Sequence, residues 1–148
     1  LGEEAGRVSF TTELDCGNHR IREPSNEGFG TISVDLDSAD NVLRAEDPVL
    51  IKIDVEGEEL RVLKGSGRIL QKKSLIAVVM ETFRPHNFAQ ADLIAAEAIL
   101  SEHGFVPMAY KPWQRELVVL TQPSDGGQNT IYVRGPGEVA QRLNPHFS

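Results

Sequence analysis

Acidic side chains follow two strongly apolar runs of the chain, at the points where those runs end. Asp54, Glu56 and Gly57 lie at or just after the end of VLIKIDV (49–55), and Glu81 closes SLIAVVME (74–81), with His86 shortly after it. Because the carboxyl ends of parallel strands meet at one edge of an α/β sheet, we expect these side chains to lie close together. Asp54, Glu56, Glu81 and His86 are the candidate catalytic residues, since carboxylates and an imidazole can accept or hold a proton. Alternatively, the carboxylates only stabilise backbone amides at a helix start.

Other chemistries have weaker support in the sequence. The acidic run Glu56, Glu58 and Glu59, with Asp54, could bind Mg²⁺ or Ca²⁺. A metal-assisted hydrolase could use Asp54, Glu56 and Glu81. On a helix, however, Glu56, Glu58 and Glu59 point in different directions, so we favour a solvated helix start over a metal site. The sequence contains no G-x-x-x-x-G-K-S/T phosphate loop, no H-E-x-x-H and no G-x-S-x-G. The lone Cys16 excludes an internal disulfide and a cysteine-based zinc site.

Composition indicates one globular domain over residues 1–148, and the alternation of strand and helix patterns described below predicts an α/β fold. Hydrophobic residues make up 40% of the 148 residues, and 15 Lys and Arg against 22 Asp and Glu give a net charge of −7. This balance argues against nucleic-acid binding and against attraction to anionic membranes. No apolar run is long enough to span a membrane and no secretory signal is visible, so we expect a cytoplasmic protein.

The apolar pattern predicts strands alternating with helices. We expect a β-hairpin with a long connection, a short helix, then strand, helix, strand and helix, followed by two last strands and a weakly helical tail. The corresponding ranges are 7–14 and 30–38 (hairpin), 39–45, 49–55, 56–73, 74–81, 91–104, 105–110, 129–134 and 137–148. Continuous apolar strands are typical of a sheet that is covered on both faces.

Two smaller features can be interpreted in more than one way. The string AYKPWQR (109–115) could be a loop that faces a substrate, although we favour an ordinary loop in which Trp113 covers an edge of the core. His103, just before Gly104, is expected to contact the carboxyl end of its helix.

The segment LIKIDVEGEELRVLKGSGRIL resembles the signature K-I/L-D-V-E-G-x-E-x-x-V-L-x-G of the FkbM family of S-adenosylmethionine-dependent methyltransferases. This resemblance implies a class I methyltransferase fold, which is Rossmann-like, with an antiparallel last strand in a mixed sheet. It also implies S-adenosylmethionine as cofactor and methyl transfer to a hydroxyl of a sugar or small molecule. Asp54 and Glu56 would line the transfer site with Glu81 across from them, and Asp54 and Gly57 would bind the cofactor.

One departure from the family pattern is the absence of a Gly-rich cofactor turn. The GFG string at 28–30 does not lead from a strand into a helix, so the chain is expected to correspond to the C-terminal part of such an enzyme and to be inactive alone. The signature strand would then have an unpaired edge, which predicts a homo-oligomer or pairing with an N-terminal half. The alternative function is a non-enzymatic domain that self-associates or binds a partner.

Overall fold

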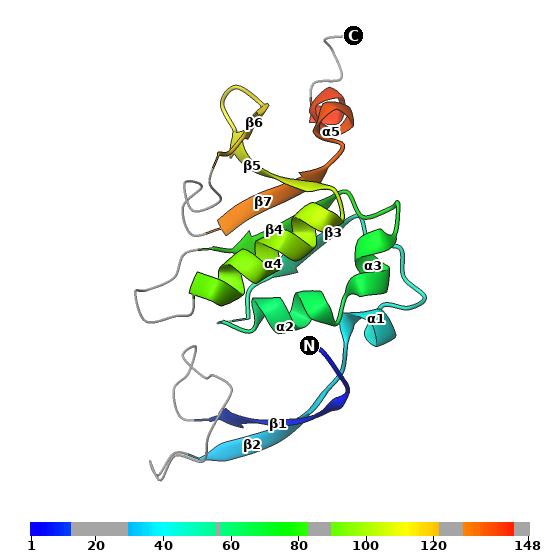
Figure 1. Cartoon of the computed structure of the whole chain (residues 1–148), viewed down its shortest axis with the longest axis vertical. Coiled ribbons are helices and arrows are strands. Elements are labelled where there is room, and N and C mark those ends of the chain that lie inside the picture. The colour runs from blue at the N-terminus through cyan, green and yellow to red at the C-terminus, as the bar shows by residue number, and fades with distance from the viewer. Residues whose placement is uncertain (13–29, 56, 83–89, 122–128, 144–148) are drawn as a thin grey trace.

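The computed structural model describes residues 1–12, 30–55, 57–82, 90–121 and 129–143. The chain forms an α/β structure with a separate two-stranded ribbon (Figure 1). Its elements are β1 (Gly6–Thr11), β2 (Thr31–Leu36), α1 (Ala39–Val42), β3 (Leu50–Ile53), α2 (Glu59–Lys64), α3 (Gly67–Gln71), β4 (Ala77–Glu81), α4 (Gln90–Glu102), β5 (Phe105–Lys111), β6 (Glu116–Val119), β7 (Asn129–Arg134) and α5 (Pro136–Leu143).

The main sheet has five strands in the order β3-β4-β7-β5-β6. β3 and β4 are parallel, whereas β7 runs antiparallel to both β4 and β5, and β6 runs antiparallel to β5. The predicted mixed sheet with an antiparallel last strand is therefore confirmed. The predicted hairpin is also present, since β1 and β2 pair antiparallel from Gly6 opposite Leu36 to Thr11 opposite Thr31.

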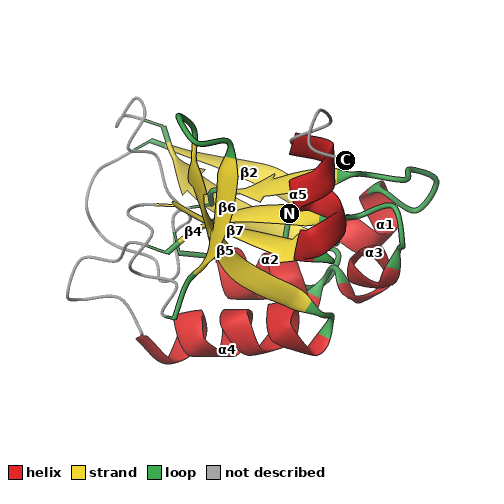
Figure 2. Ribbon diagram, turned by 90° about the horizontal axis from the view of Figure 1, so that it is seen from above, coloured by secondary structure: helices red, strands yellow, loops and turns green. Residues whose placement is uncertain are grey.

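Helices α2, α3 and α4 lie together on one face of the main sheet (Figure 2). Alternate strand residues point to this face and form the core with the helices. Val78 and Met80 of β4 and Tyr132 of β7 are almost completely buried there, against Leu63 of α2 and Leu100 of α4. Burial of such side chains contributes roughly 1.5–3 kcal/mol each, which makes this layer the main source of stability.

The opposite face of the sheet is less completely covered among the described residues. α5 packs beside β6, while Leu50 of β3 and the preceding Val49 remain 55% and 54% exposed. The expectation that strand 49–55 is covered on both faces is therefore wrong for this chain. The physical reason is that β3 lies at the edge of the sheet, and α2 and α3 cover only the face that carries Ile51 and Ile53.

The helix expected over 56–73 is two helices, α2 and α3, separated at Gly65 and Ser66. A side chain at Gly65 would collide with the carbonyl oxygen of Gly2 and lie 3.1 Å from Glu3, because the N-terminal segment crosses the chain there. The Ser66 hydroxyl donates to the carbonyl of Val62 instead of continuing the helix. The Gly-Ser-Gly string at 65–67 is a local signal for such a break, which the helical spacing of the apolar residues outweighed in the prediction.

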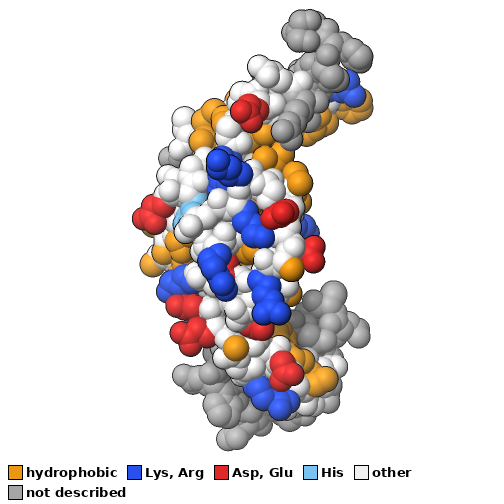
Figure 3. Space-filling model, turned by 90° about the vertical axis from the view of Figure 1, so that its right-hand side faces the viewer, with side chains coloured by type: hydrophobic (Ala, Val, Ile, Leu, Met, Phe, Trp, Pro, Cys, Tyr) orange, Lys and Arg blue, Asp and Glu red, His pale blue; other side chains and the backbone are white. Residues whose placement is uncertain are grey.

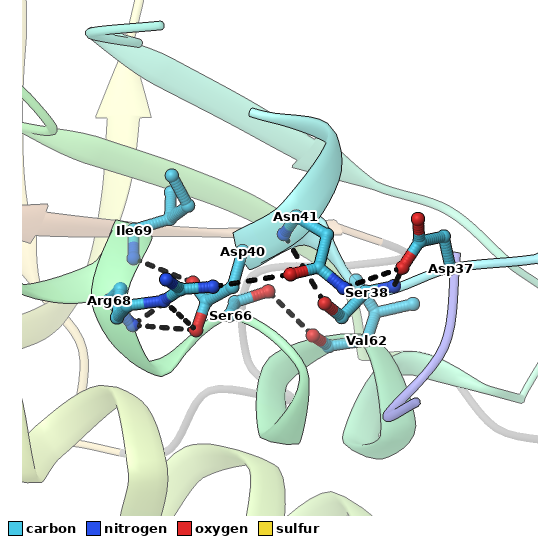
Figure 4. Close-up of polar contacts among 8 residues, drawn as sticks. All are labelled: Asp37, Ser38, Asp40, Asn41, Val62, Ser66, Arg68 and Ile69. Carbon is cyan, nitrogen blue, oxygen red and sulfur yellow. Dashed lines mark hydrogen bonds and ion pairs between the residues drawn. The ribbon is translucent and has the colours of Figure 1, made fainter. Parts of the chain in front are cut away.

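Asp40 fixes the start of α3 from a different part of the chain (Figure 4). Its carboxylate accepts hydrogen bonds from the backbone N–H groups of Arg68, at 2.9 and 3.0 Å, and of Ile69, at 2.9 Å. A carboxylate at this position satisfies amides that have no partner within the helix. Arg68 also pairs with Asp40 at 3.5 Å, so α1 and α3 are joined by several polar contacts.

Arg134, the last residue of β7, caps the carboxyl ends of two helices. Its guanidinium donates to the carbonyl oxygens of His103 after α4 and of Leu70 and Lys72 at the end of α3, and it lies 4.3 Å from the ring centre of Phe105. Burial lowers the pKa of Arg134. Figure 3 shows the right-hand side of the molecule in Figure 1, where Lys and Arg side chains gather across the middle with Asp and Glu side chains around them.

The His103 prediction is confirmed. Its Nδ1–H donates to the carbonyl of Ile99 at 2.8 Å, and Gly104 takes the left-handed conformation, with φ of 79°, that ends α4. Two other expectations are wrong: the segment between the last predicted strands contains β6, and the tail contains the regular helix α5. β6 is a four-residue strand recognisable only by its pairing with β5.

Candidate active site

Two acidic residues follow neighbouring register positions at the edge of the sheet where β3 and β4 end. The parallel ladder pairs Ile53 with Met80, so the next residues, Asp54 and Glu81, follow on neighbouring strands and share the face opposite α4. Neighbouring strands are about 4.8 Å apart, which places the two side chains within reach of one substrate group. Glu81 is paired in turn with Asn129 at the start of β7. The sequence prediction that Asp54 and Glu81 lie together is consistent with this register.

Lys52 orients the Asp54 carboxylate. The two residues are on the same face of β3, and Lys52 Nζ donates to Asp54 Oδ2 at 2.7 Å. The Asp54 side chain is 43% exposed and that of Lys52 57%, so the pair contributes little to stability, about 0–1 kcal/mol. Its effect is local: a cation holds the carboxylate at the open edge of the sheet, accessible to a ligand.

Glu59 holds the turn between β3 and α2. It is only 1% exposed, and its Oε1 accepts hydrogen bonds from the backbone N–H groups of Gly57 at 3.2 Å and Val55 at 3.4 Å. Gly57 has φ of 99°, a conformation that glycine adopts without strain. The expectation of a solvated helix start is therefore wrong for Glu59, whose carboxylate stabilises the turn that follows Asp54.

The buried side of the same edge is closed by two threonines. Thr82 follows β4, Thr130 lies on β7, and their hydroxyl groups are 2.8 Å apart with 2% and 0% of each residue exposed. A mutual hydrogen bond satisfies two polar groups that would otherwise be costly to bury. Sequence reasoning missed this pair, and neither residue stands in a motif that could have revealed it.

The other sequence candidates fall into two groups. Gly57 lies in the turn after Asp54, whereas Glu56 and His86 lie outside the described residues. Within the ranges that the structure describes, no group of three or more His, Cys, Asp or Glu side chains is placed to bind a metal ion. The described residues thus give the metal-assisted hydrolase no support.

Aromatic residues approach this edge on β5 and the turn after it. β5 runs in the same direction as β4, because both are antiparallel to β7, so its carboxyl end, with Tyr110 and Lys111, reaches the same side of the sheet as Glu81 (Figure 1). Trp113 in the following turn is 94% exposed. The interpretation that Trp113 covers an edge of the core is therefore wrong.

Comparison with known proteins identifies the family. A family model described as the methyltransferase FkbM domain matches residues 4–107, which is more than half of the chain. The chain belongs to the FkbM methyltransferase family. No curated protein and no solved structure matches it.

The FkbM match contains most of the site. Asp54, Gly57, Glu59 and Glu81 all lie within residues 4–107, while Asn129 on β7 lies beyond them. In this FkbM domain the signature residues have distinct roles: Asp54 faces the open edge, and Gly57 and Glu59 shape the turn behind it. The signature glycine Gly65 leaves room for the N-terminal segment. In the part of the chain that the structure describes, no helix is long and apolar enough to cross a membrane.

Proposed function

We propose that this domain contributes to methyl transfer from S-adenosylmethionine to a hydroxyl oxygen at the edge where β3 and β4 end, together with a Gly-rich cofactor turn from an N-terminal half or a second copy. The observation that carries the proposal is the pair Asp54 and Glu81 on one face of that edge, inside a methyltransferase family match. The order β3-β4-β7-β5, with β7 antiparallel between two parallel strands, supports assignment of these strands to the carboxyl part of a Rossmann-like class I methyltransferase sheet.

The chemistry of the available groups fits the cofactor. S-adenosylmethionine carries positive charge and ribose hydroxyls, and a carboxylate such as Asp54 complements both. The turn at Gly57, held by Glu59, brings backbone close to the same place without a side chain in the way. When bound, the cofactor supplies a methyl group on a cationic sulfur.

The residues of the chain would then orient the acceptor and take its proton. Alignment of the acceptor oxygen with the methyl carbon is the largest contribution that a rigid sheet edge can make. S-adenosylmethionine held at this edge would supply the methyl group and keep the electron pair of its broken sulfur–carbon bond, and a carboxylate of the chain would take the proton of the acceptor hydroxyl. Glu81 is the described residue that we assign to this last step. His86 and Glu56 remain proposed members of the site.

Titration calorimetry with S-adenosylhomocysteine, the product form of the cofactor, tests the proposal. We expect a micromolar dissociation constant, which corresponds to a binding free energy of about −8 kcal/mol, and at least tenfold weaker binding for Asp54→Asn. The matched control is Asp35→Asn on β2, which belongs to the separate two-stranded ribbon and whose carboxylate is 90% exposed and paired with Arg7 at 3.6 Å. Absence of heat from the unmodified chain, or equal loss in both variants, would overturn the cofactor assignment.

A second candidate function, a non-enzymatic domain that self-associates, is favoured by β3. Among the described residues, β3 pairs only with β4, and its outer edge is left without a neighbouring strand. Such an edge, beside the exposed Val49 and Leu50, can add a strand from a second copy of the chain. Sedimentation at a protein concentration of tens of micromolar, roughly the range in which exposed strand edges associate, distinguishes the two candidate functions. Dimers without cofactor binding would support the second function, and a cofactor-binding monomer would exclude it.

A further inference from the structure

The outer edge of β3 presents main-chain groups in a regular alternation. The carbonyl of Val49 accepts hydrogen bonds from the N–H groups of Ile76 and Ala77, at 2.9 and 3.2 Å, so Val49 and every second residue after it bond towards β4. Leu50 and Lys52 therefore direct their N–H and C=O groups away from β4. Within the described ranges no strand lies on that side, so this edge has the groups to pair with one more strand.

The side chains of the same strand alternate between charged and apolar. Lys52 and Asp54 share one face, where they form an ion pair at 2.7 Å and remain 57% and 43% exposed. Ile51 and Ile53 lie on the other face and line an apolar hollow, which Leu43 at the end of α1 also borders. A strand that fits this edge must carry apolar side chains on one face. On the other face it must place an acid opposite Lys52 and a base opposite Asp54.

β3 itself, taken in the opposite direction, is such a strand. Two identical edges close a pair through a two-fold axis, which makes the two strands antiparallel. With the axis at Ile53, each Lys52 lies opposite Asp54 of the other copy, and the two Ile53 side chains meet on the apolar face. An axis at Lys52 would set the two lysines opposite each other, and an axis at Ile51 would set Lys52 opposite Leu50. Of these three registers, only the axis at Ile53 brings opposite charges together.

We propose that two copies of this chain pair along β3 with the two-fold axis at Ile53, so that Lys52 of the second copy enters the candidate site beside Asp54. Each Asp54 carboxylate then lies between two ammonium groups, one from each copy, and the two candidate sites become neighbours in one continuous sheet. The pairing depends on the β3 edge alone. Its effect on the site rests on the proposed function, which assigns the cofactor to Asp54.

Local complementarity has to act against the overall charge. Each copy carries a net charge of −7, which opposes association at long range. At the paired edge, by contrast, each copy contributes one Lys and one Asp, so the contact is neutral and its charges alternate. We therefore expect a dimer that forms at tens of micromolar, roughly the range of exposed strand edges.

Charge reversal on β3 tests both the partner and the register. Sedimentation velocity of the unmodified chain should show a dimer at about 10–100 µM. Lys52→Glu leaves acids at both positions, and Asp54→Lys leaves bases at both, so each variant alone sets like charges opposite each other. Each should raise the dissociation constant of the dimer about tenfold or more. An equimolar mixture of the two variants restores opposite charges across the axis and should form mixed dimers as tightly as the unmodified chain.

The ribbon supplies matched controls. Arg7→Glu and Asp35→Lys reverse the same kinds of charge in an exposed ion pair of 3.6 Å between β1 and β2, and they should leave dimer formation unchanged. Circular dichroism confirms the folding of each variant. Where a single variant fails to fold, the double variant Lys52→Asp with Asp54→Lys keeps opposite charges both within the chain and across the axis, and it should dimerise.

Three results would overturn the pairing. They are a monomer at about 100 µM, a mixture of the two β3 variants that stays monomeric, and ribbon controls that weaken the dimer as much as the β3 variants do. Sedimentation is read without cofactor. A dimer with this charge dependence that does not bind S-adenosylhomocysteine would count against the proposed methyl transfer alone, whereas a monomer that binds S-adenosylhomocysteine would count against the pairing alone.

Discussion

Replacement of Gly65 by alanine should destabilise the domain although alanine is the better helix former. An ideal Cβ at position 65 would overlap the carbonyl oxygen of Gly2 and stand 3.1 Å from both the Cα and the carbonyl oxygen of Glu3. All three atoms belong to the backbone, so no side-chain rotation can relieve the contact. The N-terminal segment would have to move away, losing the hydrogen bond from the Gly2 N–H to the carbonyl of Asp37.

The magnitude follows from two opposing contributions. Overpacking against a fixed backbone costs about 1–3 kcal/mol, and a lost hydrogen bond costs about 1 kcal/mol. Alanine recovers about 0.5–1 kcal/mol through reduced chain entropy. We therefore expect Gly65→Ala to lower the free energy of unfolding by about 2 kcal/mol. Gly67→Ala is the matched control, since the nearest atom to its Cβ is Asp40 Oδ2 at 4.0 Å, and it should stabilise by about 0.5–1 kcal/mol.

Urea unfolding followed by circular dichroism measures both variants. The Gly65→Ala midpoint should fall by about 1 M, given a slope of roughly 2 kcal/mol per molar. In a chain that begins at Glu4 the obstructing atoms are gone, so the same substitution should there be neutral or slightly stabilising. If Gly65→Ala and Gly67→Ala shift the midpoint equally in the full chain, the close approach of the N-terminal segment is not what position 65 requires.

Three further outcomes are expected. Arg134→Lys should lower the free energy of unfolding by about 2 kcal/mol, because an ammonium cannot reach three carbonyl groups at two helix ends. The control, Arg61→Lys at an exposed site, should lower it by less than about 0.5 kcal/mol. Equal losses in urea unfolding would contradict the role given to Arg134. Burial raises the pKa of Glu97, so its ionisation opposes folding as the pH rises above about 4.5. The free energy of unfolding of Glu97→Gln should therefore fall less over this range than that of the unmodified chain or of the control Glu102→Gln. Parallel profiles of stability against pH would refute this. Glu59→Ala should cost about 2–4 kcal/mol, because it removes the buried carboxylate that accepts hydrogen bonds from two amides of the turn, and it should weaken S-adenosylhomocysteine binding. Glu59→Gln keeps an acceptor oxygen and should retain most of the stability and the binding. Calorimetry in which the two variants bind equally would contradict this.

The sequence predicts the parts of the fold that depend on local pattern. The runs 49–55 and 74–81 are mostly apolar and rich in β-branched residues, and they contain the parallel neighbouring strands β3 and β4. The spacing of Leu93, Ala96 and Leu100 predicts α4, and all three are buried. Features that depend on distant contacts were not predictable: the close approach of Gly2 to Gly65 joins segments far apart in the sequence, and β6 becomes a strand only by pairing with β5.

The candidate site divides in the same way. Asp54 and Glu81 were predictable because each ends an apolar run, and parallel pairing brings such ends together. Glu59 was misinterpreted because an acid in the first turn of a helix is usually solvated, and only the folded turn shows its carboxylate pointing back to Gly57. Trp113 was misplaced because a lone apolar residue in a loop is usually drawn towards the core, whereas the ordered hairpin holds this one in solvent.

The position of β7 has a consequence for how the chain reaches its folded state. β7 is the last strand along the chain, yet it lies between β4 and β5, which share no hydrogen bonds with each other in the ladder. During synthesis, the pair β3–β4 and the hairpin β5–β6 therefore stay unconnected by hydrogen bonds until residues 129–134 leave the ribosome and pair with both. A chain cut at residue 107, where the family match ends, would lack the strand that unites the sheet and should not complete its folding.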